Sequence, residues 1–76
     1  MIYKIKQAIQ RAGLETLPEN DKDDLIDYGM DSLMMVLSVA ELEKLFKIKI
    51  PASLFSEEKF ESIHSIKEFM IQLGAK

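Results

Sequence analysis

The sequence contains no cysteine and only one histidine among its 76 residues. Disulfide bonds are therefore excluded, and the spaced Cys and His pairs that hold structural zinc are absent. A chain of this length buries only about 60% of the surface that its unfolded form exposes, so its stability margin is small. An apolar core must stabilise the fold alone, and the length fits a single domain covering residues 1–76.

The sequence also lacks long apolar runs and an excess of basic residues. Its apolar runs are only a few residues long, far below the roughly 20 residues of a membrane-spanning helix. The N-terminal segment contains lysines where a secretory signal would be continuously apolar. Thirteen acidic and ten basic residues give a net charge of −3, whereas nucleic-acid binding requires a basic surface. We therefore expect a cytoplasmic monomer with no transmembrane segment and no nucleic-acid partner.

What the sequence does contain is the spacing of amphipathic helices. Ile2, Ile5, Ile9 and Ala12 recur at intervals of three and four residues, which predicts a first helix that ends at Gly13. The periodicity then fails from residue 14 to residue 28, a segment rich in aspartate. We expect a long loop there, which holds four apolar side chains against the core: Leu14, Leu17, Leu25 and Ile26.

A second helix is expected to begin at Asp31 or Ser32 and to run to about Lys47. At 100° per residue, four of its apolar side chains share a narrow arc and form the expected core face: Met35, Val39, Leu42 and Phe46. Other apolar residues fall outside that arc, so the beginning of the helix is apolar on nearly all sides. Lys44 and Lys47 near its end complement the negative pole of the helix.

The remainder of the chain predicts two further helices. Ile48 and Ile50 alternate with polar residues before Pro51, but a lone strand has no partner here, so we interpret this segment as an extended connector. A short third helix is expected from Ser56 to Phe60, with Ser53 or Ser56 as its cap. Apolar side chains at helical spacing predict a last helix, capped by Ser62 and ended by Gly74: Ile63, Ile66, Met70 and Leu73. The expected fold is all-α with four helices, one of them short.

The residues needed for catalysis are not found in a recognisable arrangement. His64 is the only histidine, and no sequence feature connects it to a nucleophilic serine, so we interpret it as a surface residue. The aspartates of residues 21–27 are more typical of a solvated or docking surface than of an acid and base pair. No glycine-rich phosphate loop and no metal-ligand spacing is present. The sequence therefore predicts a protein that is not an enzyme and has no metal site.

Ser32 is the residue that needs an explanation. It can be a helix cap, a role for which Asp31 is an equal candidate. Alternatively its hydroxyl is covalently modified, because a phosphodiester there would lie over the free N–H groups and positive pole of the second helix. Gly29 would let the backbone turn tightly before the serine. Helix geometry alone leaves both interpretations open.

The segment "DYGMDSLMMVLSVAEL" and the following "EKLFKIKIP" resemble the acyl carrier protein family. The hallmark of that family is a Gly-x-Asp-Ser-Leu element at the start of the second helix, and Gly29, Asp31, Ser32 and Leu33 match it. Downstream residues also fall at the hydrophobic and loop positions of the family: Val36, Leu42, Phe46, Ile48, Ile50 and Pro51. The resemblance covers most of the chain and implies a four-helix bundle of the acyl-carrier type.

The resemblance implies a cofactor and a set of partners. Ser32 would receive 4′-phosphopantetheine from coenzyme A through a Mg²⁺-dependent phosphopantetheinyl transferase, with Asp31 in transferase and metal recognition. The thiol of the arm would carry cargo as a thioester, while activating and transferring enzymes dock in turn. The protein itself would catalyse nothing. Five residues are the expected docking surface for these partners: Leu33, Met34, Val36, Leu37 and Glu41.

The cargo remains open between two classes. The leading hypothesis is a freestanding carrier of acyl groups, and the alternative is an aminoacyl (D-alanyl-like) or peptidyl carrier. Met34, Met35 and Leu37 stand where fatty-acid carriers are acidic or polar, and "PASLFSEEKFESI" resembles D-alanyl and other aminoacyl carriers. Docking of Met34, Val36 and Leu37 competes with packing of these residues under the first loop. A third hypothesis, an unmodified helical interaction module, is disfavoured by the intact Ser32 motif.

Overall fold

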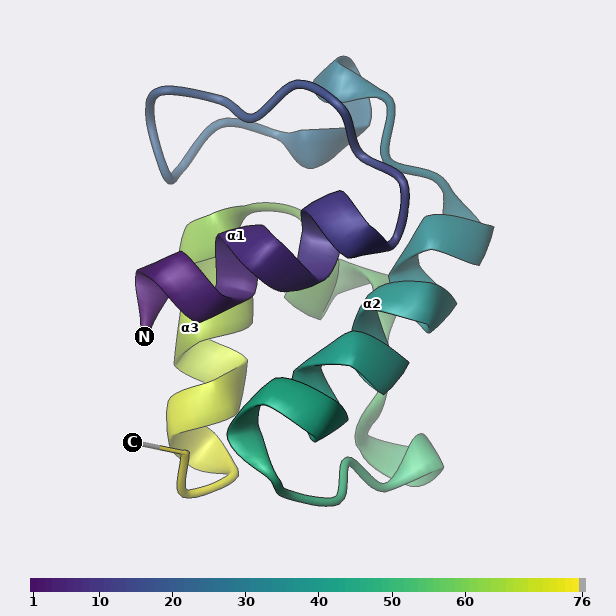
Figure 1. Cartoon of the computed structure of the whole chain (residues 1–76), viewed down its shortest axis with the longest axis vertical. Helices are drawn as coiled ribbons and strands as arrows, with labels where there is room; N and C mark the ends of the chain where they lie inside the picture. Colours follow the sequence, from purple (N-terminus) through teal and green to yellow (C-terminus); the bar gives the residue numbers. More distant parts are fainter. Residues whose placement is uncertain (76) are drawn as a thin grey trace.

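Three α-helices and three 3₁₀ turns form the regular structure of residues 1–75, the part of the chain that the computed structural model describes. No strand occurs in this part, so the all-helical prediction is confirmed (Figure 1). The α-helices are α1 (Ile2–Arg11), α2 (Ser32–Phe46) and α3 (Ile63–Gln72). The 3₁₀ turns are η1 (Leu25–Tyr28), η2 (Ala52–Leu54) and η3 (Glu57–Phe60).

The four-helix bundle is not confirmed, because the expected short third helix is not an α-helix. The segment after Ser56 forms the 3₁₀ turn η3, which spans four residues and is preceded by η2. Ser56 occupies the capping position, but its side chain makes no capping hydrogen bond. Four residues are too few to build a ladder of i to i+4 hydrogen bonds, and short segments of this kind adopt the tighter 3₁₀ geometry.

The helices surround a shared interior. Helix α1 packs against both α2 and α3, and η3 packs against α3 and α2. Figure 1 shows the long loop leaving the end of α1, arching over it, and returning through η1 to the start of α2. The helix ends match their predicted signals, since Gly13 and Gly74 follow α1 and α3 with positive φ and the Ser62 hydroxyl accepts the Ser65 N–H at 3.0 Å.

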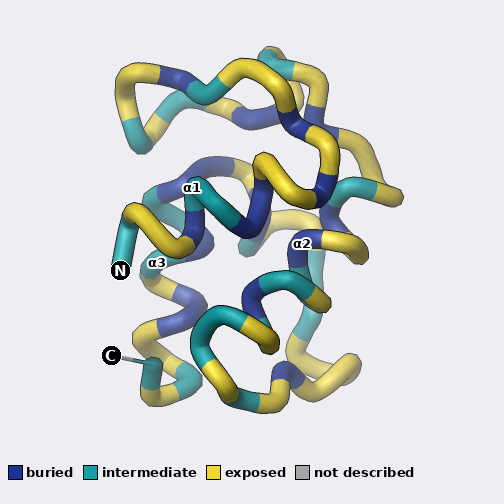
Figure 2. Tube along the Cα trace, in the orientation of Figure 1, coloured by how far each residue is buried: buried dark blue, intermediate teal, exposed yellow. Residues whose placement is uncertain are grey.

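The core combines aliphatic side chains from every helix with one aromatic cluster. Buried positions face inward along the three helices (Figure 2). Phe60 is fully buried, and its ring lies 5.5 Å from that of Phe55 and 6.2 Å from that of Phe69, measured between centroids. The largest fully buried apolar side chains are Phe60, Ile5, Ile9, Leu14, Leu25, Leu42, Ile63, Ile66 and Met70.

Some apolar residues expected in the core are less buried than predicted. Ile26 is 58% exposed, because the η1 turn directs its neighbour Leu25 inward and Ile26 outward. Phe46 is only half-buried at the last position of α2, where the Lys4 ammonium lies 5.3 Å from the centre of its ring. Val39 is also half-buried, whereas Met35 and Leu42 are buried as predicted. The core face of α2 is therefore narrower than the expected one.

The long loop is fastened to the start of α3. The Leu25 N–H donates to the Glu61 carbonyl at 2.7 Å, and the His64 N–H donates to the Asp21 carbonyl at 2.8 Å. The Lys6 ammonium lies 3.9 Å from the Asp21 carboxylate. His64 itself is a surface residue as predicted, with its imidazole 3.7 Å from a Glu68 carboxylate oxygen and nearly half exposed. These contacts hold the segment that leads into the start of α2.

Within residues 1–75, Ser38 in the middle of α2 is the one residue whose buried side chain has an unpaired polar atom. Its side chain is fully buried, and its hydroxyl has no hydrogen-bond partner within residues 1–75. We expect Ser38→Ala to stabilise the fold by about 1 kcal/mol, because it removes an unsatisfied polar group and improves helix propensity. Urea denaturation followed by circular dichroism measures this. A loss of stability would mean that the hydroxyl has a partner such as a buried water molecule.

Candidate functional site

The turn that leads into α2 depends on a glycine. The Asp24 carboxylate accepts the Ile26 N–H at 3.1 Å and begins η1, which ends at Gly29. Gly29 has φ +105°, a conformation that residues with a Cβ rarely adopt. The next residue, Met30, is 4% exposed and anchors the turn in the core. The start of α2 therefore lies at the surface, directly after a residue that is held in the core.

Asp31, and not Ser32, caps α2. The Asp31 backbone is extended, and its carboxylate accepts the Met34 N–H at 2.8 Å. Ser32 is the first residue of the helix and is exposed, and no side-chain hydrogen bond of its hydroxyl occurs within residues 1–75. The two sequence-based roles are thereby separated between neighbours. The aspartate supplies the cap, and the serine hydroxyl is free to react.

The start of α2 can accommodate a negatively charged group on Ser32. The first four N–H groups of a helix have no partner within the helix, and Asp31 uses that of Met34 only. The N–H groups of Ser32 and Leu33 are left without a partner inside the helix and contribute to its positive pole, where a phosphodiester is favoured. The exposure of Ser32 also leaves space for attachment. These residues thus fit a phosphate-linked group.

The five predicted docking residues divide into two groups. Leu33, Val36 and Leu37 are 67%, 57% and 43% exposed, so they do not pack under the first loop. Met34 is half-buried and packs against the core, where its Cε would lie 3.4 Å from a Cβ placed on Gly13. The Glu41 carboxylate lies 3.8 Å from Arg11 and 3.4 Å from Lys44.

Two surface hollows lie along the middle and the C-terminal end of α2, and neither was predicted from the sequence. One, of about 230 Å³, is lined by apolar side chains of α2 and of the segment around η2: Val36, Val39, Ile50, Ala52 and Phe55. The other, of about 480 Å³, lies at the C-terminal end of α2 and is lined by Ala40, Glu43, Lys44, Lys47, Ile48 and Lys49. The three lysines within six residues were visible in the sequence, but only the fold places them around one hollow.

A third hollow lies on the other side of the turn, where Tyr28 meets the loop after α1. It has a volume of about 330 Å³, and Gly13, Tyr28, Gly29 and Met34 contribute to its lining. The Tyr28 hydroxyl donates to the Asp23 carboxylate at 3.3 Å. Desolvation, followed by the negative charge of Asp23, raises the pKa of the Tyr28 phenol above its ordinary value. The phenol is therefore a neutral hydrogen-bond donor at neutral pH, and it ties η1 to the acidic loop.

The described residues form neither a metal site nor a membrane-spanning helix. Within residues 1–75, no three His, Cys, Asp or Glu side chains converge to hold a metal ion. The same residues include no helix that is long and apolar enough to span a bilayer. His64 lies on α3 and contacts Glu68, whereas Ser32 begins α2. The start of α2 is therefore the site to explain.

The capping role of Asp31 can be tested separately from any role of its charge. Asp31→Ala removes the acceptor of the Met34 N–H, and we expect it to lower the free energy of unfolding by about 1 kcal/mol. Asp31→Asn is the matched control, because asparagine caps helices about as well as aspartate. Chemical denaturation of both variants measures the difference. Equal loss in both variants would show that charge, and not capping, is the stabilising property.

Comparison with known proteins agrees with this geometry. Residues 4–70 match the family model described as "Phosphopantetheine attachment site". The chain is 38% identical over 71 residues to the D-alanyl carrier protein of Streptococcus uberis, covering 92% of this chain and 90% of that protein. No solved structure gives a significant match. The chain therefore belongs to the family of phosphopantetheine-dependent carrier proteins, in which 4′-phosphopantetheine is covalently attached to the protein.

Proposed function

We propose that this protein is an aminoacyl carrier of the D-alanyl type, with its arm attached to Ser32. The observation that carries the choice of cargo is the 38% identity, over nearly the whole of both chains, to a protein named D-alanyl carrier protein. The resemblance of residues 51–63 to aminoacyl carriers supports the same choice. The exposure of Ser32, at the first position of a capped helix, supports the choice of attachment residue.

Three residues prepare the attachment site in this proposal. The Ser32 hydroxyl forms the phosphodiester with phosphopantetheine from coenzyme A, and the adenosine bisphosphate part of coenzyme A leaves. Asp31 fixes the helix start through its bond to the Met34 N–H and contributes negative charge for the transferase and its Mg²⁺. Gly29 provides the turn that presents the serine. The terminal thiol of the bound arm supplies a thioester linkage for the cargo, and the chain itself catalyses no reaction.

Partner enzymes, namely the phosphopantetheinyl transferase and the enzymes that load and transfer the cargo, are proposed to dock on the exposed apolar side chains beside Ser32. Leu33, Val36 and Leu37 are large, apolar and solvent-exposed on one helix, a combination that marks interaction sites on soluble proteins. Met34 and Glu41 have a supporting role in this proposal. Met34 braces α2 against the loop after α1, and Glu41 connects α2 to Arg11.

A carrier of longer acyl groups is the second candidate, and the apolar hollow favours it. The hollow of about 230 Å³ beside Val36 and Phe55 could shelter a hydrocarbon chain. A D-alanyl group gains nothing from this hollow, because its ammonium would lose hydration without finding a charged partner. The two candidates therefore differ in whether the cargo contacts the hollow.

Competitive loading of the holo-protein distinguishes the two cargoes. The holo-protein is incubated with ATP, equal concentrations of D-alanine and fatty acids, and an extract of the cells that make this chain, and the bound cargo is identified by intact mass. We expect a D-alanyl thioester that is released by hydroxylamine. A fatty-acyl thioester in its place would assign the protein to the second candidate. No thioester on wild-type holo-protein would contradict both.

A further inference from the structure

The exposed face of α2 changes character along its length. Five exposed residues of α2 lie within an arc of about 100° when successive residues are separated by 100° around the helix axis. We call this surface the docking face, and it consists of Leu33, Val36, Leu37, Ala40 and Lys44, with the exposed Lys47 directly after the end of the helix. It is apolar beside Ser32 and basic at the other end. At 1.5 Å per residue, Leu33 and Lys44 are separated by about 16 Å along the axis.

The basic character of the far end is not cancelled by the nearby carboxylates. Lys44, Lys47 and Lys49 line one hollow of about 480 Å³, and among the described residues that line it one, Glu43, is acidic. The Glu43 carboxylate accepts the Ile50 N–H at 2.8 Å. The Glu41 side chain is 19% exposed and lies between Arg11 and Lys44, whereas the Lys44 side chain is 71% exposed. A partner approaching this end therefore meets mainly ammonium groups.

This basic end contrasts with the acidic segment that precedes α2. Residues 15–31 contain seven acidic residues and one lysine, in a chain whose net charge is −3. Cations near the C-terminus of a helix also stabilise the helix itself. That effect fades beyond the last turn, but Lys49 lies three residues after the end of α2. Helix stabilisation therefore does not account for the whole cluster.

We propose that the basic end of α2, formed by Lys44, Lys47 and Lys49, docks an acidic patch on the enzyme that loads this carrier. The inference rests on the proposed function, because the loading enzyme must reach the arm at Ser32 and so covers the neighbouring docking face. The fitting partner has an apolar patch beside its active site and carboxylates about 16 Å away, the spacing between Leu33 and Lys44 along the helix. Because one contact is apolar and the other is ionic, the helix can bind the partner in only one of its two directions.

An acidic protein surface fits these observations better than an anionic lipid surface. A bilayer presents uniform negative charge and has no reactive centre to place beside Ser32. The docking face is continuous from Leu33 to Lys44 on α2, and Lys47 follows directly after the helix. A protein that covers the apolar part therefore also reaches the lysines. Binding to anionic vesicles remains a separate outcome that the experiment can detect.

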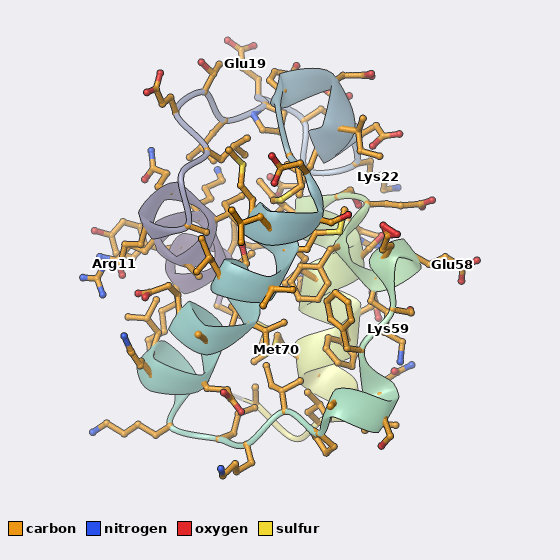
Figure 3. The ribbon with its side chains drawn as sticks, turned by 90° about the vertical axis from the view of Figure 1, so that its right-hand side faces the viewer. Arg11, Glu19, Lys22, Glu58, Lys59 and Met70 are labelled. Atoms are coloured by element: carbon orange, nitrogen blue, oxygen red, sulfur yellow. The ribbon has the colours of Figure 1, made fainter. Side chains whose placement is uncertain are left out.

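The test compares two variants with the same change in net charge. Lys44→Gln/Lys47→Gln neutralises the basic end, and Lys22→Gln/Lys67→Gln is the control on the long loop and α3. In Figure 3, Lys22 lies toward the top of the molecule, away from the C-terminal end of α2 at the bottom. Both variants and the wild type are converted to the holo form, confirmed by mass, and their folding is compared by thermal melting. The apparent KM for each holo-protein is then measured with the loading enzyme purified from the source cells.

We expect the basic-end variant to raise the KM about fivefold at low ionic strength, as the loss of two exposed ion pairs predicts, with kcat unchanged. The control should change the KM less than about twofold, and the difference should vanish in about 1 M NaCl, where charges are screened within about 3 Å.

Equal KM values for the two variants would overturn the inference. An unchanged KM, combined with lysine-dependent binding to phosphatidylglycerol vesicles and none to phosphatidylcholine vesicles, would instead assign the basic end to a membrane. A wild-type protein that accepts no arm would remove the proposed function and this inference with it. If the carrier accepts the arm and is loaded, but the two variants have equal KM values, only this inference is removed and the proposed function stands.

Discussion

Phe60→Ala is expected to lower the free energy of unfolding by about 3 to 5 kcal/mol, the usual cost of truncating a buried aromatic side chain. Phe60 is fully buried, and its ring packs between Phe55 and Phe69. A domain of this size is stabilised by only about 4 to 11 kcal/mol in total. The variant should therefore unfold at much lower urea concentration, or fail to fold at 37 °C, as monitored by circular dichroism.

Phe46→Ala is the matched control for this prediction. The sequence placed Phe46 on the expected core face of α2. In the structure it is half-buried and contacts the Lys4 ammonium, so its truncation should cost less than half as much as that of Phe60. A larger loss for Phe46 than for Phe60 would contradict the packing described for η3.

Ser32→Ala is expected to abolish loading of the carrier while leaving the fold intact. Without the hydroxyl there is no oxygen to form the phosphodiester, so neither the arm nor any thioester should be detected. The free energy of unfolding should change by less than about 0.5 kcal/mol, because Ser32 is exposed and Asp31 supplies the helix cap. Ser53→Ala is the control, since Ser53 is also exposed and lies outside the proposed site. Loading of Ser32→Ala at the wild-type level would contradict the attachment site.

The parts of the fold that could be predicted from the sequence are those determined by local chemistry. The spacing of Ile5 and Ile9 predicted the buried face of α1, and the glycines predicted the helix ends. The Ser62 cap of α3 was predicted from the same rules and is confirmed by its 3.0 Å bond to the Ser65 N–H. These features depend on residues that lie within a few positions of one another.

The parts that could not be predicted depend on contacts between distant residues. Both Leu25 and Ile26 are apolar, and the choice between them follows from the hydrogen bond of Leu25 to Glu61, which lies far along the chain. Phe46 contacts Lys4 because α1 packs against α2, and this contact joins residues far apart in the sequence. The short third helix is the exception, because its 3₁₀ geometry follows from the length of the segment itself.

The candidate site was easier to predict than its surroundings. The Gly-x-Asp-Ser-Leu element predicted the turn at Gly29 and the start of α2 at the following residues, because both are local features. The sequence left the capping role open between Asp31 and Ser32, and the bond to Met34 decides it. The division of the docking residues into exposed and packed side chains required the rotation of α2, which only the packed fold provides.

The most direct measurement is the mass of the intact wild-type protein after incubation with coenzyme A, Mg²⁺ and a broad-specificity phosphopantetheinyl transferase, followed by peptide mapping. We expect a single phosphopantetheine adduct on the peptide that contains Ser32. An unmodified protein, or an adduct on any other residue, would contradict it.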